Sequence, residues 1–185
     1  STSGAGGGKT GVAGSVAISI ATTDTQASIG APSVTIIDGT DASLKKDVSL
    51  KAESAVSNTA KALPSNGGGV GTDVGVGASV AVNVGQNTTA ASIGDGSVLT
   101  GAHDLTLTAE SSAEMSTEAK SGAKGSTAVT PVVAVSVSNN DTRTTLGTQT
   151  GGTLTLTGAL SATAKLESAV ETTAEGDTES DKTGV

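Results

Sequence analysis

Few side chains in this sequence could do chemistry, and the best placed is the single histidine. His103 is followed directly by Asp104, a pair that suits proton transfer or metal binding. A serine-type triad or a zinc site needs a nucleophile or further ligands nearby, and the sequence offers neither in a repeated arrangement. We interpret His103 as a turn residue and expect the chain not to be an enzyme.

Three aspartates are weak candidates for binding calcium. Asp38 and Asp41 lie in an insertion of the first sequence repeat, and Asp73 lies in the glycine-rich stretch 68–76. That stretch follows the calcium-binding nonapeptide only until its large apolar position, which is Gly75. Tandem copies share each ion in sites of this type, so one incomplete copy indicates a linker. We expect no cofactor, with calcium the one ion that these carboxylates could hold.

Two asparagines begin glycosylation sequences at equivalent places of two repeats. These sequences are Asn87-Thr88-Thr89 and Asn140-Asp141-Thr142. Asparagine also favours corners of the backbone, and we favour a corner over a glycan at both positions. The glycine-rich residues 4–10 imitate a phosphate-binding loop but have Ser3 where the first glycine is required, so they predict no nucleotide site.

The elements that would position these residues come in three copies. The apolar phrase around Val16 recurs 64 residues later at Val80 and a further 53 residues later at Val133. Such an internal period indicates one supersecondary unit stacked on itself. We expect a single elongated domain over residues 1–185, with repeats at about 10–66, 70–123 and 126–181. The last four residues, KTGV, repeat residues 9–12, and we expect one period of a longer array.

Alternating residue types predict long strands in each copy. From Leu105 every second residue up to Ala119 is small or apolar, while Glu110, Glu114 and Glu118 occupy the opposite parity. A helix would place Glu167, Glu171 and Glu175 on one face, where like charges repel. We therefore favour strands over helices.

The first apolar segment of each repeat, which spans residues 15–29 in the first repeat, predicts a corner within the segment. Val16, Ile18 and Ile20 share one face, whereas Ile29 has the opposite parity. If all four side chains are buried, a corner or bulge must separate Ile20 from Ile29. We expect linkers at residues 64–69 and 121–125, which are rich in glycine.

The predicted fold class is all-β, a β-solenoid (parallel β-helix) built from three tandem repeats of 53–64 residues. Coils of about 22 residues would give roughly eight coils and a rod about 38 Å long, with valine, isoleucine and leucine stacked inside. The alternative is a stack of antiparallel long β-hairpins, in which residues 105–119 pair with 127–137.

The composition excludes several classes of protein. The sequence contains no Phe, Trp, Tyr or Cys and carries a formal charge of −8. We expect a thin aliphatic core because aromatic rings are missing, and the acidic balance predicts that nucleic acid is not a partner. No apolar run approaches the about 18 residues of a membrane span.

Two phrases resemble the repeats of large bacterial filamentous adhesins of the leukotoxin and filamentous-haemagglutinin type. They are residues 79–96 (SVAVNVGQNTTAASIGDG) and residues 104–111 (DLTLTAES). The resemblance spans about residues 12–175 and implies an elongated β-helical stalk that is secreted to the cell surface. It implies no catalytic residues.

We therefore expect a structural segment of a secreted, extracellular fibre or adhesin, acting as a stalk or a self-assembling filament. Its expected partners are further copies of itself, end to end, or adjoining repeats, and its acidic outer faces are expected to limit lateral aggregation. The alternative is a surface-binding module, such as a threonine-rich solenoid that binds ice or glycans. Outward threonines in residues 105–108 and 153–157 suggest it.

Overall fold

Alternation of small and polar residues produces very long strands. A computed structural model describes residues 1–30, 34–35, 46–148 and 153–185, and it holds ten strands and no helix in these ranges. Within them, therefore, no helix exists that could cross a membrane. The strands are β1 (Thr2–Gly6), β2 (Thr10–Ile29), β3 (Val34–Thr35), β4 (Val48–Val70), β5 (Val74–Ile93), β6 (Val98–Ala102), β7 (Leu105–Val129), β8 (Val132–Leu146), β9 (Thr153–Leu156) and β10 (Leu160–Gly184).

The described strands pair in parallel, and the fold is all-β. β5 lies between β2 and β8, β7 lies between β4 and β10, and β6 lies between β3 and β9. The register sets Val16 beside Val80 and Val80 beside Val133. β8 pairs with β5 and not with β7, so the antiparallel hairpin that we gave as the alternative is absent from the described residues. This arrangement is compatible with a β-solenoid.

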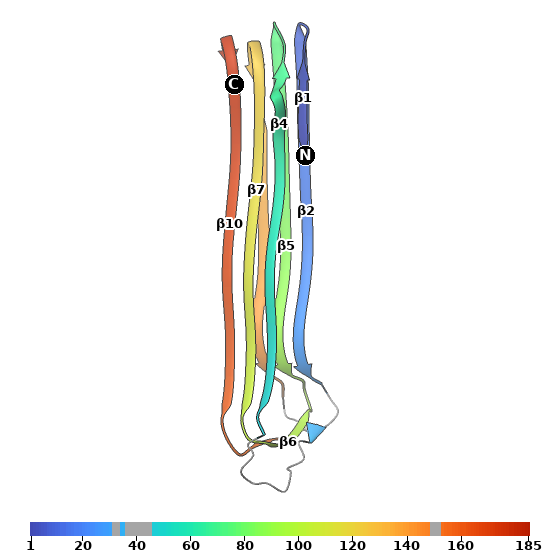
Figure 1. Cartoon of the computed structure of the whole chain (residues 1–185), viewed down its shortest axis with the longest axis vertical. Helices are drawn as coiled ribbons and strands as arrows, with labels where there is room; N and C mark the ends of the chain where they lie inside the picture. Colours follow the sequence, from blue (N-terminus) through green and yellow to red (C-terminus); the bar gives the residue numbers. More distant parts are fainter. Residues whose placement is uncertain (31–33, 36–45, 149–152) are drawn as a thin grey trace.

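The chain rises and falls along the long axis of the molecule (Figure 1). β2, β5 and β8 run one way, the short strands turn the chain at one end, and β4, β7 and β10 run back. The register aligns Thr10 with Val74, Val74 with Thr127, and Thr127 with Thr183. One full turn thus takes 64, 53 and 56 residues (74−10, 127−74, 183−127). The predicted coils of about 22 residues are wrong, and the long dimension follows the strands.

β2–β5–β8 and β4–β7–β10 are two layers of one seven-stranded sheet, joined where residues 127–129 of β7 pair with the start of β5, and we call these layers the two long sheets. Small and polar side chains fill the space between them. The inner side chains of β7 are those predicted from the alternation, from Leu105 to Ala119. The larger of the two clusters of buried apolar residues, around Ile93, Leu99 and Leu107, lies at the end that the short strands close. Further along, the buried residues are mainly alanine, serine, asparagine and glycine.

The predicted inward stacking of the valine and isoleucine phrase is wrong. Val16, Ile18 and Ile20 point outward and are 58%, 66% and 74% exposed. β2 pairs with β5 without interruption from Thr10 to Ile29, so no corner separates Ile20 from Ile29. Only small side chains fit inward here because the sheets approach closely: a Cβ on Gly77 would lie 2.1 Å from the carbonyl oxygen of Gly122.

The predicted linkers lie inside strands. Residues 64–69 belong to β4 and residues 121–125 to β7. Extra residues of β4 are absorbed by a register irregularity between Ala62 and Gly69. The chain therefore passes from one sheet toward the other without a separate loop at residues 121–125.

Candidate functional site

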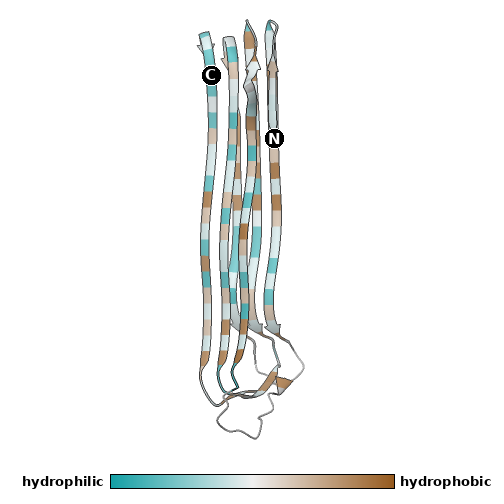
Figure 2. Ribbon diagram, in the orientation of Figure 1, coloured by the Kyte–Doolittle hydropathy of each residue, from teal (hydrophilic) through white to brown (hydrophobic). Residues whose placement is uncertain are grey.

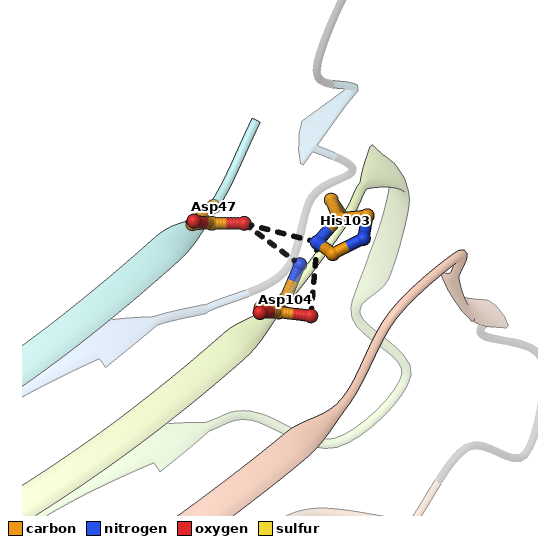
Figure 3. Close-up of side chains that lie close together, drawn as sticks. All are labelled: Asp47, His103 and Asp104. Carbon is orange, nitrogen blue, oxygen red and sulfur yellow. Dashed lines mark hydrogen bonds and ion pairs between the residues drawn. The ribbon is translucent and has the colours of Figure 1, made fainter. Parts of the chain in front are cut away.

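The one histidine lies in a small cluster with two carboxylates (Figure 3). His103 Nδ1 lies 2.9 Å from Asp104 Oδ1 and 3.3 Å from Asp47 Oδ1. Asp47 directly precedes β4 and Asp104 directly precedes β7, and the pairing of Val48 with Leu105 brings them together. Among the described residues, this is the single group of three side chains that could hold a metal ion.

The carboxylates of this cluster already serve the backbone. Asp47 Oδ1 accepts a hydrogen bond from the Asp104 amide at 3.2 Å, and Asp104 Oδ1 accepts one from the Ala159 amide at 2.7 Å. Each aspartate thus caps the next strand start in the stack. The same device recurs at another corner, where Asp95 Oδ1 accepts from the Thr148 amide at 2.7 Å. The geometry supports a capping role more directly than a metal site.

His103 occupies a bend before β7, which agrees with its interpretation as a turn residue. Its amide donates to the carbonyl oxygen of Lys46 at 2.8 Å. Sequence reasoning missed Asp47, which is 56 residues away. The signal was available, because Asp47-Val48-Ser49-Leu50 matches Asp104-Leu105-Thr106-Leu107 between two copies.

The calcium candidates do not form a site within the described residues. Asp38 and Asp41 lie outside the described residues. Asp73 is exposed in the turn between β4 and β5, where its amide donates to the carbonyl oxygen of Lys9 at 2.9 Å. It belongs to no acidic or histidine cluster that the structure describes.

The two sequon asparagines lie in strands and not at corners. Asn87 is 4% exposed, and its amide is inserted between the sheets. Its Oδ1 accepts from Ser54 Oγ at 3.1 Å, and its Nδ2 donates to Ser111 Oγ at 2.6 Å. Asn140 is its register partner in β8 and donates to Ser168 Oγ at 3.2 Å. Burial makes Asn87 unsuitable as a glycan acceptor.

Ion pairs cover the outer face of β4, β7 and β10. Lys61 pairs with Glu118 at 3.1 Å, and Lys120 bridges Glu118 at 3.0 Å and Glu175 at 3.3 Å. The hydrogen bonds from Lys120 and Lys61 lower the pKa of Glu118, and those to Glu118 and Glu175 raise the pKa of Lys120. The Lys61–Glu118 and Lys120–Glu175 pairs link neighbouring strands across the sheet, and the Lys120–Glu118 pair lies within β7.

The outward threonines do not form a continuous file. In the register, Thr108 lies between Lys51 and Thr163, and Thr106 lies between Ser49 and Ser161. A flat threonine array of the kind expected for ice binding is therefore interrupted on this face.

The glycine-rich start contributes to a hollow at the strand ends. Gly7, Gly8 and Thr72 line it together with Lys124, Glu179 and Asp181. Lys124 Nζ is already paired with Glu179 Oε1 at 2.6 Å, so the cation is compensated and two carboxylates face the hollow. This lining does not suit a phosphate group.

No family model, curated protein or solved structure matches the chain.

Proposed function

We propose that the chain is a non-enzymatic structural segment of a secreted bacterial surface fibre or filamentous adhesin. In this proposal it is a β-solenoid of three stacked turns, one for each sequence repeat, located outside the cell. Its partners are further copies of the chain or adjoining repeats. The resemblance of residues 79–96 and 104–111 to adhesin repeats supports this assignment.

One observation carries the proposal: equivalent residues of the three copies stack in parallel register along the seven-stranded sheet and the short three-stranded sheet. Backbone hydrogen bonds then run along the stacking axis. Each turn offers equivalent strand edges to the turn that follows it, so the same pairing can repeat. The residues best suited to chemistry, Asp47 and Asp104, cap strand starts in this stack.

Open strand edges supply the means of assembly. β10 pairs with β7 and β8 pairs with β5, and no described strand covers their other edges. Leu166 and Val170 occupy inward positions in β10, yet they are 44% and 49% exposed because no further turn covers them. A second copy whose β2 and β4 paired with this edge would bury them, with β4 open as far as Ala62 because β1 pairs with it from Leu63.

Electron microscopy of the negatively stained chain over a concentration series tests the proposal. The strand lengths predict elongated particles or ribbons about 65 Å wide, because β2 has 20 residues at about 3.3 Å each. Ribbons that lengthen with concentration would identify a self-assembling fibre, and isolated elongated particles a stalk segment. Compact globules would overturn the proposal.

Charged residues at the open edge provide the matched test of assembly. Leu166→Lys with Val170→Lys places charges inside the stacking edge and is expected to abolish ribbons. Thr163→Lys is the control, because Thr163 faces outward in the column that already holds Lys51. Ribbons that persist in the double variant would contradict stacking through this edge.

A further inference from the structure

The outer face of β2, β5 and β8 carries an uncharged array of β-branched side chains, which we call the aliphatic face. β2 and β5 each contribute four valines or isoleucines, β8 contributes three in register with them, and the end of β7 contributes Val129. The four columns are Val12–Val76–Val129, Val16–Val80–Val133, Ile18–Val82–Val135 and Ile20–Val84–Val137. Gly14, Ala78 and Pro131 occupy the positions between the first two columns.

This face is unlike the rest of the surface. Figure 2 shows hydrophobic bands along β2, and the structure leaves Val12, Ile18 and Val133 exposed. The nearest charged column, Asp24–Thr88–Asp141, lies beyond the array, whereas ion pairs cover the opposite sheet. The expectation that acidic outer faces limit lateral aggregation therefore fails for this face.

The size of the aliphatic face suits a partner of its own kind. Strand spacing of about 4.8 Å and about 6.6 Å between alternate residues give about 32 Å² per outer position. The four columns and the Gly14–Ala78–Pro131 positions make five columns of three positions, which cover about 500 Å². Two such faces would therefore bury roughly 1,000 Å². That buried area is at the lower bound for specific interfaces. The contiguous apolar patch is also larger than the single apolar residues that are normal on protein surfaces.

We propose that the aliphatic face binds the same face of a second copy of this chain. A flat array of valines packs well against another flat array, as sheets do in a sandwich about 10 Å thick. The contact needs no compensating charge, and the valines and isoleucines of the four columns line none of the hollows that the structure describes. A two-fold axis through Val80, the centre of the array, would bring Val80 onto its copy.

This pairing does not depend on stacking through the strand edges. The edge-blocked variant, Leu166→Lys with Val170→Lys, leaves the aliphatic face unchanged. The full-length edge-blocked chain therefore isolates the face-to-face contact, and its failure to dimerise would leave the stacking experiment valid.

Sedimentation velocity of the edge-blocked chain over a concentration series tests the pairing. We expect a monomer–dimer equilibrium, weakened at least about tenfold by an added Val80→Lys because like charges would meet at the axis. Val80→Thr keeps the shape and should weaken the dimer less. Thr106→Lys, on the outer face of β7, is the control and should change nothing. A monomer at all concentrations, or a dimer indifferent to Val80→Lys, would overturn the proposal.

A single cysteine gives an independent readout, because the sequence has none of its own. In the edge-blocked chain, Val80→Cys is expected to form a disulfide between copies on mild oxidation, while Thr106→Cys stays reduced. Flotation with phosphatidylcholine vesicles tests whether the aliphatic face binds lipid instead. Vesicle binding by a chain that does not dimerise would identify lipid as the partner and contradict the proposal.

Discussion

At the scale of single residues, the interior is held together by polar side chains that reach across the gap between the sheets. Asn83 Nδ2 donates to the carbonyl oxygens of Asn58 at 3.1 Å and Ser116 at 3.2 Å. Asn87 bridges hydroxyls of β4 and β7. Buried amides with such partners fix the position of one sheet against the other, because any slip leaves them unpaired.

Removing the side-chain amide of Asn87 should destabilise the folded protein. Asn87→Ala leaves Ser54 and Ser111 without this partner inside the protein, and we expect the free energy of unfolding to fall by about 1–3 kcal/mol. Asn140→Ala is the matched control in the same column, nearer the open edge, and should cost less. Urea denaturation measures both values, and equal losses would contradict the bridging role of Asn87.

The sequence could indicate Asn87 as special but could not assign its role. Asparagine is common at corners and in glycosylation sequences, so its local surroundings suggested both. Its partners Ser54 and Ser111 lie 33 and 24 residues away in two other strands, and only the stacking register brings them together.

At the scale of elements, the width of the gap between sheets decides which residues face inward. The alternation in β7 predicted its inner face correctly. In β2 and β5 it predicted strands but not which side was inside, because hydrophobicity argued for the valines while the narrow gap admits only small side chains. Size and not hydrophobicity selects the inner residues there, and a surface rich in exposed apolar groups is the result.

Two glycines of β5 test this account of the gap. A Cβ on Gly77 would meet the backbone oxygen of Gly122 at 2.1 Å, whereas on Gly85 it would meet the flexible ends of Met115 at 2.7 Å and Asn58 at 3.0 Å. We expect Gly77→Ala to destabilise by about 2–3 kcal/mol or more and Gly85→Ala by about 1 kcal/mol or less. Thermal and urea unfolding measure the difference. Equal tolerance at both positions would mean that the sheets are not closely apposed near Gly77.

At the scale of the whole molecule, the repeats predicted parallel stacking but not the size of a turn. Equivalent residues such as Val16 and Val80 do lie side by side. The expected short coils assumed corners at glycine-rich and asparagine-rich segments, yet residues 121–125 and Asn87 remain within strands. An alternating pattern of small and polar residues can continue through a strand of any length, so it does not mark where the strand ends. The ends depend on where the two sheets meet, and the sequence pattern does not encode that position.

The most direct test of the account is a disulfide between Ser15→Cys and Ser79→Cys. The two serine hydroxyls are 2.9 Å apart although the residues are 64 positions apart, and neighbouring strands have the spacing that a disulfide requires. Mass spectrometry of the dilute, mildly oxidised chain should find the intramolecular disulfide in nearly all molecules, and the control pair Ser15→Cys with Val80→Cys, on opposite faces, should stay reduced. A Ser15→Cys/Ser79→Cys chain that remains reduced, or links only between molecules, would contradict the parallel register on which the account rests.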